Sequence, residues 1–176
     1  MQELTGCLGI SDNMHLDNLE ILGFRATITS VNDTLSQINE IKKDGEIIQL
    51  LNADAIVSKN HIVHGVNQAF LAFERGENLA KDISVEIALR CSAQRQISKA
   101  FNILGLKEGE MNLVAILINC GDYTDELSSI FTLDESVLSP DSENLMKVYK
   151  ISDVEVEKMS LEDIIIDRIT KLTVDY

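Results

Sequence analysis

The clearest feature of the hydrophobic pattern is an unbroken apolar run from Leu113 to Ile118, inside the segment Glu108–Gly121. A run without a polar position is typical of a central strand that is covered on both faces. Two other segments, Ile21–Val31 and Glu46–Ser58, carry the alternation or the buried apolar run of a strand, and Glu3–Ile10 is a shorter candidate. The pattern therefore predicts four strands.

Apolar residues at helical spacing, preceded by capping residues, occupy most of the chain between and after these strands. Polar residues suited to the N-cap occur at Asn32–Thr34, at Ser58 or Asn60 and at Ser160, and Gly76 and Gly105 stand where helices commonly end. The predicted helices are 32–43, 58–76, 93–105, 122–133, 141–150 and 160–172.

The helix predicted over 93–105 separates apolar from polar residues. One face carries an apolar stripe at helical spacing, and the opposite face is polar and cationic. The stripe consists of Ala93, Ile97, Ala100, Phe101 and Leu104, and the polar face of Arg95, Ser98, Lys99 and Asn102.

The segment Asp82–Ala93 fits two structures. Its apolar residues alternate from Ile83 to Cys91 as they would in a strand, whereas Ser84 as a cap and a Glu86/Arg90 pair at i,i+4 fit a helix. We favour the helix, and the pattern leaves helix or strand open for 83–91. Strands interleaved with helices, without repeats, predict an α/β fold: one domain over 1–176 with a small central mixed sheet and packed helices.

Charge is distributed unevenly along this acidic chain, whose formal net charge is −14. The window Ser58–Lys107 holds seven basic and four acidic residues, so its local charge is +3, while the remainder carries −17. Such asymmetry suggests an anion-binding face on a molecule that otherwise repels polyanions, although basic residues also serve simply to pair with acidic ones on a surface.

Signatures of catalysis are absent from the sequence. It contains no G-x-x-x-x-G-K-[ST], G-x-G-x-x-G or G-x-S-x-G motif, and its carboxylates lie in acidic segments that are typical of solvated surface. His61 and His64 have the H-x-x-H spacing that places two imidazoles on one helix face, but no third metal ligand stands nearby. We therefore predict no enzyme, no metal site and no cofactor.

Location follows from similar exclusions. No apolar run reaches the length of a membrane span, the first residues lack the basic region of a signal peptide, and three cysteines without C-x-x-C spacing do not suggest a disulfide framework. We expect a cytoplasmic protein that does not contact a membrane.

A known family is matched by one ungapped stretch of 58 residues, Asn52 to Gly109. Its features are SKNHIVHGVNQAFLAFERG (Ser58–Gly76) followed by SVEIALRCSAQRQISKAFNILGLKEG (Ser84–Gly109). This stretch resembles the small tRNA-recruiting subunit of the KEOPS complex, a family that in eukaryotes includes the kinase-binding protein of the same assembly. The resemblance implies a non-enzymatic α/β protein. Such a protein binds the kinase-like ATPase subunit and holds the single-stranded 3′ CCA end of tRNA, so that the threonylcarbamoyl-adenosine (t6A) modification can be made elsewhere in the complex.

The resemblance and the cationic window together suggest which residues contact tRNA. Single-stranded RNA is read by stacking, by amide or hydroxyl hydrogen bonds and by a few phosphate contacts. Lys59, Arg95 and Lys99 suit phosphates, and the neighbouring polar groups suit bases or riboses. The predicted tRNA-binding set is Lys59, Asn60, His61, His64, Ser92, Gln94, Arg95, Gln96 and Lys99.

A surface for the kinase-like subunit is harder to locate. The helix at 160–172 has a wide apolar arc, and the segment before it is a second candidate, so we assign partner contacts to Leu145, Val148, Ile165 and Ile169. A buried core helix explains the same arc equally well. Two other functions stay open: a protein-only adaptor of the kinase-like subunit that binds no RNA, and a small enzyme whose site has no sequence signature. No DNA partner is expected.

Overall fold

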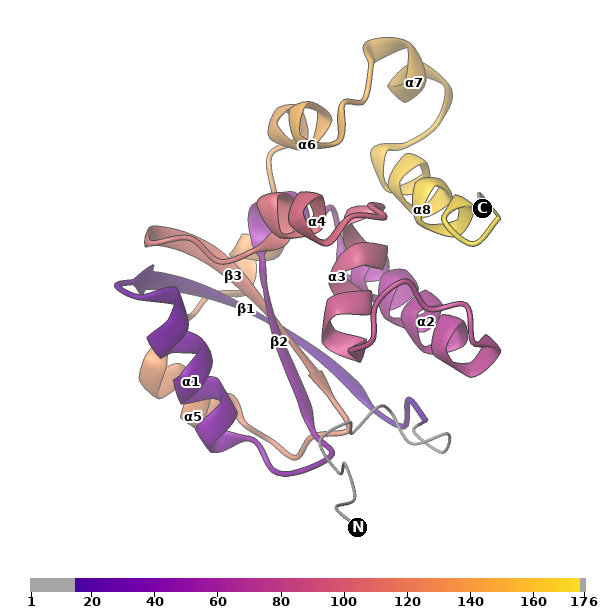
Figure 1. Ribbon diagram of the computed structural model, residues 1–176. Helices are drawn as coiled ribbons and strands as arrows, with labels where there is room; N and C mark the ends of the chain where they lie inside the picture. Colours follow the sequence, from indigo (N-terminus) through magenta and orange to yellow (C-terminus); the bar gives the residue numbers. More distant parts are fainter. Residues whose placement is uncertain (1–14, 175–176) are drawn as a thin grey trace.

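The apolar run that dominates the sequence forms the inner strand of an antiparallel sheet. A computed structural model describes residues 15–174 of the chain, and its four strands have the order β2-β3-β1-β4 (Figure 1). The strands are β1 (Leu19–Ile28), β2 (Ile47–Asn52), β3 (Gly109–Ile118) and β4 (Thr132–Leu133). The predicted strand Glu3–Ile10 lies outside the described residues.

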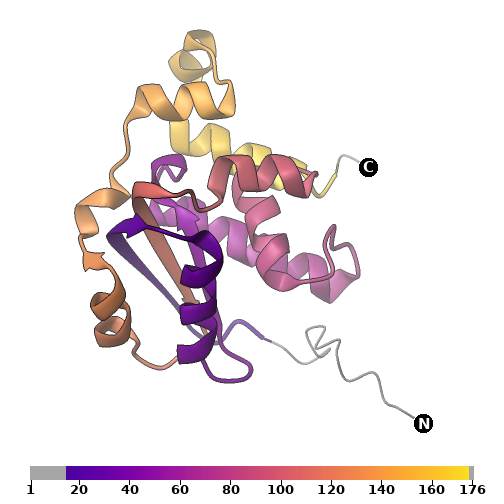
Figure 2. The same ribbon diagram turned by 60° about the vertical axis from the view of Figure 1, so that its left-hand side comes forward.

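Helices cover both faces of this sheet (Figures 1 and 2). On one face lie α1 (Val31–Ile41) and α5 (Thr124–Ile130). On the other lie α2 (Lys59–Arg75), α3 (Ile83–Ser92), α4 (Ile97–Leu104) and the short helices η1 (Ala53–Ala55) and η2 (Glu135–Leu138). The last three helices are α6 (Ser142–Tyr149), α7 (Asp153–Lys158) and α8 (Leu161–Lys171).

The α/β class is confirmed, but the sheet is antiparallel instead of mixed. β3 pairs antiparallel with both β1 and β2, so β1 and β2 run in the same direction without touching. The crossover through α1 places β2 two positions away from β1 in the sheet, and β3 occupies the position between them. A helix crossover predicts equal strand direction, yet it does not show that the two strands are neighbours.

Both faces of β3 are buried, as the apolar run predicts. Leu113, Ala115 and Leu117 pack in the core against α1 and α5, whereas the intervening Val114 and Ile116 pack in the core against α2, α3 and α4. The alternation of side chains along a strand therefore divides one apolar run between two cores.

The C-terminal helices form a third apolar cluster. It joins residues of α6 and α8 and includes the side chains of Tyr149, Ile151 and Ile164. Three contacts align α8 with α2: Ser58 hydrogen bonds Glu162, His64 bonds Thr170 at 2.8 Å, and Thr173 bonds Gln68 at 3.3 Å. The near-constant sequence separation of these pairs shows that α2 and α8 run parallel, side by side.

Several local predictions can be compared with these elements. The ambiguous segment is the helix α3, capped by Asp82 instead of Ser84, and Gly76 ends α2 with a φ of 70°, as a glycine at this place should. The predicted helix 122–133 is wrong in its last part, because α5 ends at Ile130 and the chain then extends into β4. The remaining predicted helices are confirmed, with ends that differ by a few residues, except for 93–105.

Candidate functional site

The cationic segment lies where α3 turns into α4. The predicted continuous helix 93–105 is wrong, because Ala93 adopts a left-handed conformation (φ 53°) that ends α3, and α4 begins only at Ile97. The backbone N–H groups of Ala93 and Gln94 close the last turn of α3 by donating to the carbonyls of Arg90 and Leu89, respectively. Gln94, Arg95 and Gln96 therefore belong to an exposed or half-buried connection, and Lys99 to the first turn of α4.

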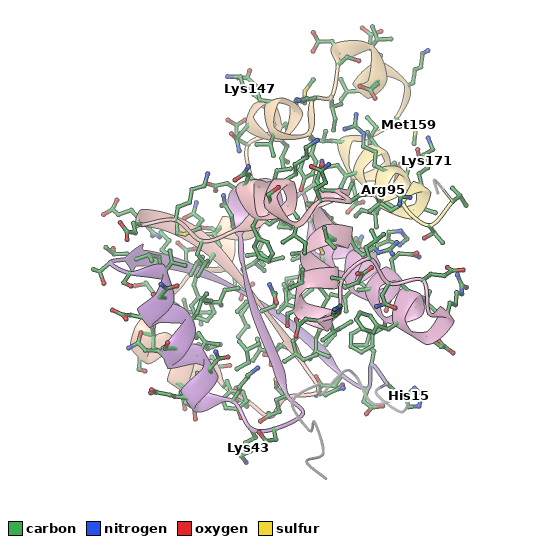
Figure 3. All side chains as sticks on the ribbon, viewed as in Figure 1. His15, Lys43, Arg95, Lys147, Met159 and Lys171 are labelled. Atoms are coloured by element: carbon green, nitrogen blue, oxygen red, sulfur yellow. The ribbon has the colours of Figure 1, made fainter. Side chains whose placement is uncertain are left out.

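Arg95 connects this turn to the end of α8. Its Nη2 donates a 2.8 Å hydrogen bond to the carbonyl oxygen of Leu172, where the helix dipole is negative, and Figure 3 shows its side chain near Lys171. The guanidinium remains exposed. Arg95 therefore links the α3–α4 turn to the end of α8 and still offers charge to solvent.

Lys59 and Asn60 lie at the other end of α8. They open α2 beside Ser58, which bonds Glu162 in the first turn of α8, and Lys59 lies 3.7 Å from an oxygen of Glu135 in an exposed pair. Because α8 has 11 residues, these groups and Arg95 are separated by about 16 Å of helix. The predicted tRNA-binding residues therefore form two groups along α8 instead of one patch.

Two residues of the predicted tRNA-binding set, His61 and Ser92, are fully buried, with both side chains 0% exposed. His61 accepts a hydrogen bond from the Val57 N–H at Nδ1 (3.1 Å) and donates from Nε2 to the carbonyl of Cys91 (2.6 Å). The Ser92 hydroxyl donates to the carbonyl of Leu89. The His61 bond to Cys91 joins α2 to α3, whereas the Ser92 bond stays within α3. His64, in contrast, is half-buried and bonds Thr170 on α8.

The predicted partner residues are mostly core residues. Leu145, Ile165 and Ile169 are 1%, 0% and 0% exposed and belong to the apolar cluster between α6 and α8. Val148 is half-buried at the edge of the same cluster. The wide apolar arc of the last helix therefore packs against α6 and α2, and Leu145, Ile165 and Ile169 have almost no exposed surface.

One known protein family matches most of the chain. The family described as kinase binding protein CGI-121 matches residues 26–171, which include every element from α1 to α8. The chain belongs to this family. A regulatory protein Cgi121 from Methanocaldococcus jannaschii is 36% identical over 121 residues, which cover 64% of this chain and 77% of that protein.

Two further relatives of this CGI-121 family chain carry the name of a complex. The EKC/KEOPS complex subunit CGI121 of Yarrowia lipolytica is 23% identical over 132 residues, or 66% of this chain and 78% of that one. The KEOPS complex subunit Cgi121 of Pyrococcus abyssi is 32% identical over 100 residues, or 54% and 58%. The resemblance expected from Asn52–Gly109 is confirmed.

The structure also shows surface residues that the sequence reading missed. Ile97 and Phe101, two residues of the predicted apolar stripe, are 50% and 37% exposed, whereas Ala100 and Leu104 of the same stripe are fully buried. The stripe is wider than the contact that α4 makes, so only one of its edges packs. A helix of eight residues with five apolar side chains could have indicated this excess.

The described residues contain neither a candidate metal cluster nor a membrane-spanning helix. Within 15–174, no three His, Cys, Asp or Glu side chains gather as a metal site would require, and no helix combines the length and apolarity of a membrane span. His61 and His64 do share one helix, but each ring nitrogen of His61 is already hydrogen bonded.

The buried His61 makes stability depend on pH. Desolvation lowers its pKa from 6.5 to about 4, so between these values the unfolded chain binds a proton that the folded chain does not. The free energy of unfolding should therefore fall as pH decreases from 6.5 to 4, by about 3 kcal/mol from this group. Urea unfolding across this range should show a shallower dependence in His61→Gln than in the exposed-site control His15→Gln. An identical dependence in both variants would contradict the assignment.

Proposed function

We propose that this chain is the KEOPS subunit that binds the kinase-like ATPase of the complex and recruits tRNA through its single-stranded 3′ CCA tail, thereby supporting t6A modification. Membership of a kinase-binding family and the KEOPS names of two relatives support the protein partner. We assign no catalytic reaction to this chain, which agrees with the regulatory and subunit names of its relatives.

One observation supports RNA recruitment most directly. Residues 87–107 contain four Lys or Arg residues and no Asp or Glu, in a chain with 29 acidic residues. Arg90 is buried, but Arg95, Lys99 and Lys107 are exposed. Most of a surface with net charge −14 repels a polyanion, but this segment does not. The charge distribution therefore favours contact with a short RNA end over contact along a whole tRNA.

Lys99 is the cleanest test of phosphate contact, because Arg95 also holds the end of α8. For single strands each neutralised phosphate contributes about −0.7 to the slope of log K against log salt concentration. We expect Lys99→Gln to reduce the magnitude of this slope by about 0.7 in a tRNA titration. Lys43→Gln, at the distant end of the molecule (Figure 3), should leave it unchanged. Equal slopes in the parent and the Lys99 variant would argue against the contact.

The partner surface for the kinase-like subunit must consist of exposed residues. Val154 and Met159, at either end of α7, are 59% and 44% exposed. Exposed apolar side chains can pack into a protein interface, so these two residues are candidates for the partner surface. We expect Val154→Asp to lower co-elution with the kinase-like subunit at least tenfold, whereas Leu35→Asp on α1, 42% exposed, should not. Unchanged co-elution of both variants would place the interface elsewhere.

A protein-only adaptor is the second candidate, and the net charge of −14 favours it. It predicts the same association with the kinase-like subunit and no tRNA binding that depends on the 3′ tail. Kinase association alone does not separate the two functions, whereas RNA binding does.

A further inference from the structure

The exposed edge of α4 combines features that occur together nowhere else in the described part of the chain. Phe101 is the one exposed phenylalanine or tyrosine among residues 15–174. Ile97 lies four residues earlier, and residues at this spacing are neighbours on a helix surface. The two side chains form a small apolar platform, which we call the α4 platform.

The groups around the α4 platform are cationic or neutral. On the exposed face of α4, Ser98 and Asn102 lie next to this platform and Lys99 lies at the opposite edge of the same face, while Arg95 and Gln96 precede the helix in the α3–α4 turn. No carboxylate lies in the sequence between Glu86 and Glu108. A ring face, neutral hydrogen-bonding groups and nearby positive charge are what an unpaired nucleotide requires for its base, its ribose or base edges, and its phosphate.

The size of the platform favours a single nucleobase over a protein partner as its occupant. A stable protein interface buries roughly 800 Å² on each partner, and two side chains cannot supply the apolar core of such an interface. One nucleobase, in contrast, is covered by a single aromatic face with an aliphatic neighbour. Charge complementarity with a phosphate backbone favours RNA further.

We propose that the α4 platform is a stacking site for one unpaired base at the 3′ end of the RNA, with Lys99 and Arg95 beside the adjoining phosphates. The inference rests on the proposed recruitment of a tRNA tail and adds the residue on which a base stacks. Stacking and charge act separately: Phe101 contributes affinity that is independent of salt, whereas Lys99 contributes the salt-dependent part.

Replacement of Phe101 tests the stacking role. In titrations of a labelled tRNA, Phe101→Ala should weaken binding by about 5- to 150-fold, the range for loss of one stacked base, without changing the salt slope. Phe101→Leu, which retains apolar volume in the half-buried part of the site, should also weaken binding. Phe101→Trp should retain affinity, and Leu35→Ala, an exposed apolar residue on the other side of the sheet, is the matched control. Circular dichroism verifies the fold of each variant.

The outcomes distinguish this inference from the proposed function. If the parent protein binds tRNA equally well with and without its 3′ nucleotides, recruitment by the tail is wrong and the inference is wrong with it. If binding depends on the tail but folded Phe101→Ala and Phe101→Leu bind like the parent, only the stacking site is overturned. Loss of kinase-subunit association by folded Phe101→Leu with intact tRNA binding would assign the α4 platform to the protein partner and would also overturn it.

Discussion

Replacing Glu86 with Leu should lower the free energy of unfolding by about 3–5 kcal/mol, because it leaves the buried guanidinium of Arg90 without its counter-charge. Glu86 and Arg90 are 0% and 2% exposed, and the carboxylate oxygen Oε1 accepts from Arg90 Nε at 2.9 Å. The other oxygen accepts from the backbone N–H groups of Leu79 and Ala80 at 2.8 and 2.7 Å. The Glu86 carboxylate therefore pairs with Arg90 on α3 and also accepts two backbone hydrogen bonds from the turn before α3.

The two partners of this ion pair should not be equivalent. Arg90→Met leaves Glu86 with two backbone donors, so this variant should lose less stability than Glu86→Leu. The double variant Glu86→Leu/Arg90→Met should recover part of the loss, since two apolar side chains can replace a buried pair. Urea unfolding monitored by circular dichroism measures the order. Arg25→Met, which breaks an exposed pair with Asp134, should change little. A mild effect of Glu86→Leu, similar to that of Arg25→Met, would contradict the account.

Ile165→Ala should destabilise the chain by about 2–5 kcal/mol, because it removes buried methylene and methyl groups and leaves a cavity between α8 and its neighbours. Ile165 is fully buried, and Ile165→Glu would place a charge there, so its effect should be larger. Loss of kinase association by Ile165→Glu would then reflect displaced helices, not a lost contact.

Hydrogen exchange in α8 together with urea unfolding tests this prediction. Exchange of the α8 amides should accelerate in Ile165→Ala, whereas Val154→Ala, at an exposed position of α7, should leave it unchanged. If Ile165→Ala retained full stability and protection but bound the kinase-like subunit less tightly, Ile165 would be a partner contact after all.

The sequence predicts those parts of the fold that depend on local pattern. The run Leu113–Ile118 indicates a strand buried on both faces, and Gly76 indicates the end of α2, because each effect depends on neighbouring residues only. The position of β3 between β1 and β2 depends on how the whole chain is arranged, and no local pattern contains it. The left-handed Ala93 is similar, since alanine has no preference that marks such a turn.

The candidate site shows the same division. Most charged side chains lie at the surface, where Arg95 and Lys99 are exposed, but Glu86 and Arg90 are buried as an ion pair. Burial depends on the neighbour that a residue meets: His61 faces Cys91, whereas Phe101 extends past the edge of the α3–α4 contact into solvent. A stripe of apolar residues predicts a contact but not its width: Ile165, for which partner surface and core were both open, is fully buried, whereas Phe101 of the α4 stripe is 37% exposed.

A titration of tRNA with and without its 3′ nucleotides, repeated with Lys99→Glu, tests the central claim most directly. If the chain recruits tRNA by its 3′ tail, the parent protein should bind intact tRNA tightly and trimmed tRNA weakly. The folded Lys99→Glu protein should bind intact tRNA weakly. Tail dependence should disappear in that variant, because repulsion replaces attraction at the acid-free segment. Equal binding of both RNAs to the parent protein would contradict recruitment by the tail and leave association with the kinase-like subunit as the proposed role.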